Sequence, residues 1–166
     1  MPKLNIRIYG DDVLRRKTHY IKKFDDRLAK LVDDMFETMY ESGGIGLAAP
    51  QVGLSKKLIV VDTQDEGEKI ALANPKIVWK SQNCLIMKEG CLSIPGVEGE
   101  VVRPDRIKVK GNDPKTGEEI VLEASDLFAR VIMHEMDHLN GVLFIDRLDD
   151  SERAAIEGQL QEFAAA

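Results

Sequence analysis

The chain has 166 residues, of which 43% are hydrophobic and 31% charged, and this composition excludes disordered and collagen-like proteins. Its length fits one compact domain, so we expect residues 1–166 to form a single domain. The 23 Lys and Arg residues against 29 Asp and Glu residues give a formal charge of -6, without a long basic run, so we expect no direct nucleic-acid binding.

Neither a membrane segment nor a targeting segment is visible. No apolar stretch approaches the ~18 residues of a membrane span, and the first ten residues lack the basic flank and apolar core of a signal peptide. We therefore expect a cytoplasmic protein with no membrane partner. Two cysteines are too few for a disulfide framework, so a thiol with a function acts alone.

The first predicted element is a helix over Asp25–Glu41. Asp25 or Asp26 can cap its start, and Gly43 and Gly44 would end it. Its apolar residues recur at steps of three and four, the spacing of one helical face. They are Leu28, Leu31, Val32, Met35, Phe36 and Met39.

The middle of the chain predicts several strands, with connections that favour antiparallel pairing. Short, partly alternating segments are separated there by Gly, Pro, Asn and Asp. Between two of these segments, Cys84 begins the apolar run Cys84–Met87, and we expect it to be a small core residue. The predicted strands are Leu58–Asp62, Ile70–Ala73, Lys76–Trp79, Arg106–Lys110 and Glu119–Glu123.

Two more helices are predicted in the C-terminal part. Ser125 can cap a helix that runs to about Asn140 and stops at Gly141. A third, amphipathic helix follows over Asp150–Ala166. Its apolar face consists of Ile156, Leu160 and Phe163. Helices on both sides of a strand-rich middle predict an α+β fold, with small antiparallel sheets packed around the helix that ends near Asn140.

That helix contains His134, Glu135 and His138 in the pattern HExxH. At about 100° per residue, His138 lies about 40° around the axis from His134, and Glu135 lies about 60° from His138. Leu127 and Val131 fall on the same side, so the histidines are expected to face the interior. The pattern predicts two imidazole ligands for one metal ion, beside a carboxylate that can take a proton from water.

The third ligand decides the class of metal site. The HExxHxxGxxH extension would require His where Phe144 stands, so that class is excluded. Two donors remain open on spacing alone: Glu157, as in thermolysin-like sites, and Cys91, within the turn-permitting segment Glu89–Ser93. The remaining histidine, His19, is predicted to be an ordinary surface residue.

A glycine-rich segment, Gly43–Gln51, directly follows the first predicted helix. Neither a following Lys-Ser/Thr pair nor a GxGxxG pattern is present, which argues against a nucleotide site. Glycines let a backbone pass close to a ligand, and Gln51 offers an amide donor that could polarise a carbonyl. The alternative is a plain turn that leads into the strand Leu58–Asp62.

Taken together, the segments GIGLAAPQ (44–51), EGCLS (89–93) and HEMDH (134–138) resemble the three signature motifs of peptide deformylase. The likeness includes GDDVLR (10–15) and LNGVLF (139–144), and it spans most of the chain. It implies that Cys91, His134 and His138 hold one divalent metal ion. The resemblance also implies that this ion is Fe2+ in the cell, and that Zn2+, Ni2+ or Co2+ can replace it in purified protein.

The resemblance implies a hydrolase that removes the formyl group from the N-terminal formylmethionine of newly made polypeptides and releases formate. Glu135 would accept the proton of the attacking water and return it to the departing amine. The side-chain amide of Gln51 and the backbone N–H of Leu92 would stabilise the oxyanion.

The same resemblance implies how the substrate is held. Ile45, Gly46 and Gly90 would bind the peptide backbone as an added strand, which tolerates varied sequence after the first residue. A lipophilic pocket would take the methionine side chain.

One departure from the family pattern is Met133, where Gln is usual before the first histidine. It lies about 100° from His134, on the side away from Glu135, so we expect the core reaction to survive. The last predicted helix carries one Arg against four acidic residues, which does not support docking on ribosomal RNA. We expect a monomer whose partners are N-formylmethionyl nascent peptides.

Overall fold

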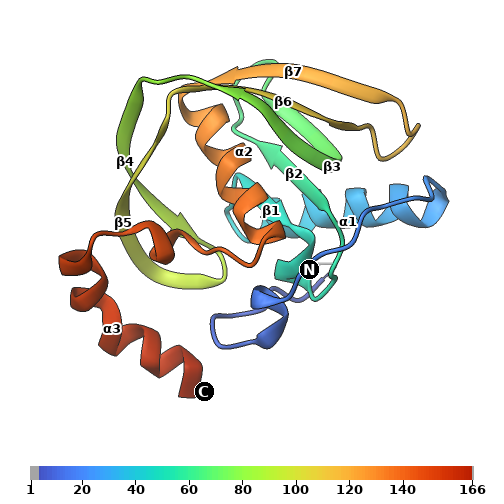
Figure 1. Ribbon diagram of the computed structural model, residues 1–166. Helices are drawn as coiled ribbons and strands as arrows, with labels where there is room; N and C mark the ends of the chain where they lie inside the picture. The colour runs from blue at the N-terminus through green and yellow to red at the C-terminus, as the bar shows by residue number, and fades with distance from the viewer. Residues whose placement is uncertain (1–3, 166) are drawn as a thin grey trace.

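The computed structural model describes residues 4–165. It shows the predicted α+β fold, in which two antiparallel sheets surround a central helix (Figure 1). This helix, α2 (Asp126–Leu139), contains the two histidines of the HExxH pattern and packs against strands of both sheets. Residues 1–3 and Ala166 lie outside the described part, so the prediction that the last helix reaches Ala166 concerns a residue that is not described.

The larger sheet has five strands in the order β1-β2-β3-β6-β7, and the smaller one is a two-stranded ribbon of β4 and β5. All neighbouring strands pair antiparallel, as expected from the short connections. The bounds are β1 Gly46–Ala48, β2 Leu58–Asp62, β3 Lys69–Lys80, β4 Cys84–Cys91, β5 Ile94–Pro104, β6 Arg106–Asn112 and β7 Glu119–Ser125.

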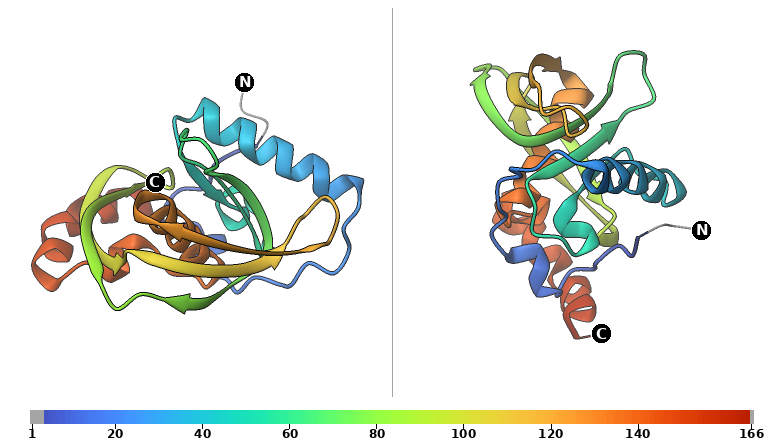
Figure 2. Two further views of the ribbon diagram at one scale, coloured as in Figure 1. Left: turned by 90° about the horizontal axis from the view of Figure 1, so that it is seen from above. Right: turned by 90° about the vertical axis from the view of Figure 1, so that its right-hand side faces the viewer.

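Strand β2 is buried on both faces, which explains its continuous apolar sequence. Ile59 and Val61 pack in the core that includes α2, whereas Leu58 and Val60 pack in the core that includes α1 (Asp26–Glu41). Figure 2 accordingly shows α1 and α2 on opposite sides of the larger sheet at β2. Burial of each such side chain stabilises the fold by roughly 1.5–3 kcal/mol, so β2 holds together the core that includes α1 and the core that includes α2.

The predicted helices are present, with small differences at their ends. The side chain of Asp25 caps α1 by accepting a hydrogen bond of 3.0 Å from the Leu28 N–H. Ser125 occupies the N-cap position of α2, but the structure gives its side chain no capping hydrogen bond. Helix α3 (Asp150–Ala165) buries Leu160 against β5 and the segment before α3, and its other predicted apolar residues pack beside it.

Strand β3 joins two segments that the sequence predicts as separate strands. The strand is irregular at Asn74, whose φ of 52° lies in the left-handed region, and its register against β6 shifts there. The Asn74 side chain accepts a 2.8 Å hydrogen bond from the Ile21 N–H and donates a 2.9 Å bond to the Ile21 carbonyl. This side chain therefore ties the N-terminal segment to the irregular point, which the sequence shows only as a break.

The ribbon of β4 and β5 is the main element that the sequence analysis does not predict. Ile86 and Val102 face each other across it, and they are 64% and 58% exposed. One face of the ribbon is thus open to solvent, so its apolar residues do not mark a core there. The prediction that Cys84 is a core residue is wrong for the same reason, because Cys84 is exposed at the start of β4, opposite Pro104.

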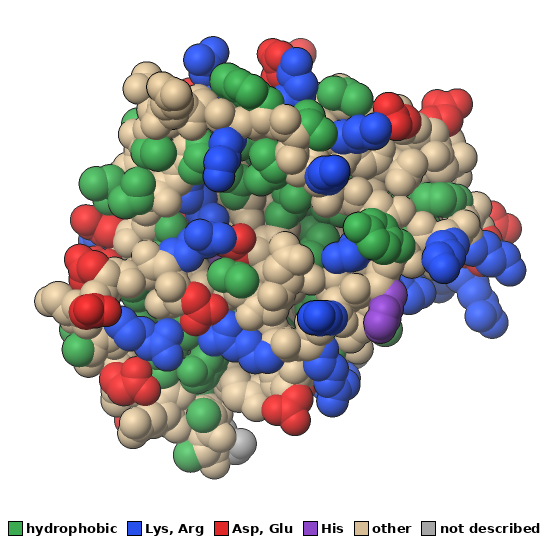
Figure 3. Space-filling view, viewed as in Figure 1, with side chains coloured by type: hydrophobic (Ala, Val, Ile, Leu, Met, Phe, Trp, Pro, Cys, Tyr) green, Lys and Arg blue, Asp and Glu red, His purple; other side chains and the backbone are tan. Residues whose placement is uncertain are grey.

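Charged side chains of both signs are interspersed over the face of the molecule shown in Figure 3. His19 is exposed, as predicted. Among the helices of residues 4–165, none has the length and apolar character needed to cross a membrane.

Candidate metal centre and active site

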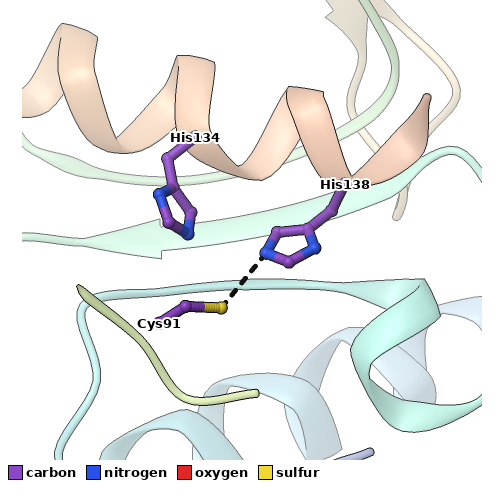
Figure 4. Close-up of side chains that lie close together, drawn as sticks. All are labelled: Cys91, His134 and His138. Atoms are coloured by element: carbon purple, nitrogen blue, oxygen red, sulfur yellow. Dashed lines mark hydrogen bonds between the residues drawn. The ribbon is translucent and has the colours of Figure 1, made fainter. Parts of the chain in front are cut away.

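Three potential metal ligands meet where β4 ends beside α2. His134 and His138 lie one turn apart on α2, and Cys91 is the last residue of β4 (Figure 4). One ligand atom from each residue lies within 4.8 Å of the other two, and the Cys91 Sγ is 3.4 Å from the His138 Nε2. Both histidines are buried, and Cys91 is half-buried. The structure thus brings together the three residues predicted to hold a metal ion.

Glu89 orients the first histidine. Its Oε1 lies 2.8 Å from the His134 Nδ1, which leaves the other ring nitrogen to face the metal position. A carboxylate on the outer nitrogen is the usual arrangement behind a metal-ligating histidine. Burial favours a neutral His134 ring, but hydrogen bonds with Cys91 and Glu89 outweigh it and raise the pKa of His134 well above its usual value.

His138 is in a different electrostatic position. Burial, together with the nearby positive charge of a protonated His134, lowers the pKa of His138 well below its usual value. The ring is therefore neutral at pH 7, the form in which an imidazole binds a metal ion, whereas His134 would release its proton when an ion binds. Its Nδ1 is buried without a hydrogen-bond partner in the described part of the chain, and its Nε2 faces the sulfur of Cys91.

The carboxylate of Glu89 is held in a buried network of charges. The Arg103 Nε donates to the Glu89 Oε2 at 2.6 Å, and the Arg103 Nη2 donates to the Glu89 Oε1 at 2.9 Å. The Arg130 Nη1 also donates to the Glu89 Oε2, at 2.6 Å. Arg103 also binds Asp137 at 2.9 Å. Burial opposes the charged form, but the bonds from His134 and Arg103 prevail and lower the pKa of Glu89 to about 2.

Glu135 stands beside the cluster and is buried. Burial raises the pKa of Glu135 to about 7, so it can both accept and release a proton near neutral pH. Its Oε1 is buried and has no hydrogen-bond partner in the described part of the chain. Gly46 makes room for this carboxylate, because a Cβ at that position would lie 2.6 Å from the Glu135 Oε2 and 2.7 Å from Val131.

Gln51 lies in a short 3-10 helix (Ala49–Val52) directly after β1. Its Oε1 accepts a 2.9 Å hydrogen bond from the Ala48 N–H, so its amide nitrogen must point the other way. The Nε2 donates to the Ser93 Oγ at 3.2 Å and lies 3.5 Å from the Cys91 Sγ. The fold therefore fixes an N–H donor of a buried residue at the edge of the cluster.

These groups line a cleft of about 680 Å³. All the predicted site residues lie on it except His138, which is 1% exposed and stands behind the others. The predicted residues on the cleft are Ile45, Gly46, Gln51, Gly90, Cys91, Leu92, His134 and Glu135.

Glu157, the alternative third ligand, and Met133, the departure from the family pattern, do not line the cleft. Glu157 is exposed on α3, where it accepts a 3.3 Å hydrogen bond from Arg153, and it is not part of the ligand cluster. Met133 is 5% exposed and packs in the core between α2 and the larger sheet. The geometry excludes the thermolysin-like arrangement and gives Met133 a packing role.

Sequence reasoning missed the charged partners of the site, namely Glu89, Arg103 and Arg130. A charged residue in a sequence is expected to be exposed, because charged residues are rarely buried unless they are paired. One signal was available for Glu89: it precedes Cys91 by two positions, and residues two apart in a strand share a face. That signal requires β4 to be recognised as a strand.

The donor set fits a divalent transition metal. One thiolate and two imidazoles suit Zn, Fe, Ni and Co, and three protein ligands leave a position open for water or substrate. The partnerless Glu135 oxygen next to that position fits a bound water. The residues present therefore fit a catalytic ion rather than a closed structural site.

Comparison with known proteins agrees with this chemistry. The sequence profile of the family "Polypeptide deformylase" matches residues 3–154. Peptide deformylase 1 of Clostridium acetobutylicum is 56% identical over 148 residues, which cover 89% of this chain and 96% of that protein. The structure of peptide deformylase 1B of Arabidopsis thaliana has a TM-score of 0.90 and 45% identity, covering 96% of this chain and 89% of that one. Peptide deformylase of Thermus thermophilus has a TM-score of 0.90 and 41% identity, covering 98% of each chain. The chain belongs to the polypeptide deformylase family and is a metal-dependent hydrolase that removes N-formyl groups from nascent peptides.

Proposed function

We propose that Cys91, His134 and His138 hold the single divalent ion of this deformylase, and that the ion is Fe2+ in the cell. Zn2+, Ni2+ or Co2+ can occupy the same donors in purified protein. A bound ion of this kind supplies Lewis acidity, which lowers the pKa of water and polarises a carbonyl. The observation that supports the proposal most directly is that three ligands converge and that Glu135 lines the same cleft as two of them, Cys91 and His134.

Glu135 is the proton carrier. It takes a proton from the water that attacks the formyl carbon, and it gives that proton to the amide nitrogen as the C–N bond breaks. Formate and a peptide with a free amino-terminal methionine result. Burial raises the pKa of Glu135 above that of an exposed carboxylate, which suits a group that takes up and then releases a proton.

Gln51 and the backbone N–H of Leu92 stabilise the negative oxygen that develops on the formyl group. The Gln51 amide needs little reorganisation for this role, because the Ala48 N–H already fixes its orientation. Loss of one such donor typically costs ~3 to 4 kcal/mol of transition-state stabilisation.

The peptide backbone binds as an additional strand along Ile45, Gly46 and Gly90. Strand β1 is the terminal strand of the larger sheet, and β4 pairs with β5 in the ribbon, so within residues 4–165 each has one edge without a partner strand. The cleft is lined by Ile45 and Gly46 at the β1 edge and by Gly90 at the β4 edge. Leu127 and Val131 on α2 supply an apolar wall for the methionine side chain.

We further propose that residues 1–166 act as a single catalytic domain. The enzyme works as a monomer in the cytoplasm, where N-formylmethionyl nascent peptides are its partners. Its charge of -6 supports action on these peptides without direct nucleic-acid binding.

The test is to load anaerobically purified protein with Fe2+ and to measure formate released from a short formyl-Met peptide. Cleavage of the same peptide without the formyl group is measured in parallel. Formate from the formylated peptide alone is the expected result. Peptide-bond cleavage of the unblocked peptide without formate release would show a metallopeptidase and refute the proposal.

A further inference from the structure

The N-terminal strap, residues 6–9, forms one wall of the cleft. It lies between the 3-10 helix of Gln51 and the turn after β4. The Arg7 N–H donates to the Gln51 carbonyl at 2.6 Å, and the Tyr9 N–H donates to the Ser93 carbonyl at 2.8 Å. Both acceptors belong to residues joined by a side-chain hydrogen bond at the edge of the metal cluster. The strap is therefore fixed to the catalytic region by its backbone.

The side chains of the strap alternate between the cleft and its outer side. Ile6 and Ile8 line the cleft, whereas Arg7 does not. The Arg7 guanidinium lies instead against Gly53 and binds Asp11 at 3.2 Å. This alternation is expected of an extended segment, in which residues two apart share a face.

Two isoleucines on one face make an apolar surface that the catalytic residues do not need. Ile6 is half-buried and Ile8 is 36% exposed, so a ligand could cover further apolar area on both. This wall is separate from the one that Leu127 and Val131 of α2 provide. Apolar side chains that line a ligand cleft offer area for contact with a substrate.

We propose that Ile6 and Ile8 form an apolar subsite for a side chain of the formyl peptide that follows methionine. The inference rests on the proposed function, since it takes the substrate to bind as an added strand. In such a strand successive side chains point to opposite sides, so the side chains after methionine do not all follow it toward α2. The strap would then give this enzyme a preference for apolar residues next to the formylmethionine.

The first experiment uses the metal-loaded enzyme with formyl-Met-Leu-Leu and formyl-Met-Ala-Ala. In the variant Ile8→Ser, the ratio of kcat/KM for the leucine peptide over the alanine peptide falls by about fourfold. A change of this size corresponds to the loss of roughly one buried methylene group. The backbone bonds of the strap do not involve this side chain. A ratio equal to that of the wild type would overturn the proposal.

A charge substitution separates contact with the substrate from loss of structure. Ile8→Lys raises the ratio of kcat/KM for formyl-Met-Glu-Glu over formyl-Met-Lys-Lys by up to about fivefold, which is typical of an exposed ion pair. The matched control is Asn5→Lys, which adds the same charge to an exposed residue that does not line the cleft. If both variants changed the ratio equally, the effect would be general attraction and the subsite would be refuted.

These results are distinct from failure of the proposed function. If the metal-loaded wild-type enzyme released no formate from any formyl peptide, the proposed function would fail and the subsite with it. If the wild type were active on all four peptides and the ratios were unchanged in both variants at position 8, only the subsite would fail.

Discussion

Replacement of Glu89 by Gln should weaken both the metal site and the fold. The pKa of Glu89 falls from 4.5 to about 2 in the folded protein, because the bonds from His134 and Arg103 outweigh the effect of burial. A difference of this size corresponds to about 3 kcal/mol in favour of the carboxylate. Gln keeps an oxygen for the His134 Nδ1 but removes the charge that balances Arg103 and Arg130.

The expected loss of stability follows from this uncompensated charge. Breaking a buried ion pair from one side costs about 3 to 5 kcal/mol, so the urea midpoint of the variant should fall clearly. Because the folded pKa of Glu89 is depressed, its contribution is complete above pH 4.5 and is lost as the pH falls from 4.5 to about 2. Wild type and Glu89→Gln should therefore converge in stability across that range.

Metal affinity gives the second measurement. Loss of an outer partner of a ligating histidine typically weakens metal binding ~10- to 100-fold, which competition with a chelator can measure at pH 7. The matched control is Glu123→Gln on β7, where the carboxylate is 79% exposed and lies 3.5 Å from Lys108. That variant should change stability by no more than about 1 kcal/mol. The reasoning would be refuted if the two variants had the same metal affinity and the same urea midpoint.

Four further variants test the other parts of the site. Cys91→Ser should lose metal during dialysis whereas Glu157→Ala should retain it, as measured by elemental analysis; the reverse result would contradict the ligand assignment. Glu135→Ala should keep the metal but lose formate release by a factor of ~100 or more, and an active variant would remove its proton-carrying role. Gly46→Ala places a Cβ 2.6 Å from the Glu135 Oε2 and 2.7 Å from Val131, so kcat should fall while the metal content stays the same; unchanged kcat would show that the carboxylate position is not critical.

The sequence alone determined the helices and the part of the metal centre that lies on one helix. An amphipathic period of 3.6 residues is a property of neighbouring positions, so α1 and α3 could be predicted with their buried faces. For the same reason His134 and His138 could be placed on one side of a helix, where the structure has them. The partnership with Cys91 was different: spacing left Glu157 open, and only the resemblance of three motifs to one family favoured the cysteine.

Tertiary structure decided what depends on contacts between distant segments. Ribbon β4–β5 could not be predicted from its apolar residues, because Ile86 and Val102 face solvent and the ribbon is defined by cross-strand pairing. The burial of Glu89 was also hidden, since a charged residue becomes a core residue only when its counterions arrive from β5 and α2. The N-terminal strap is a further case, because only folding places Ile6 and Ile8 beside Gln51. Periodicity fixes which way a side chain points from its own element, whereas register and charge pairing between elements decide what it meets.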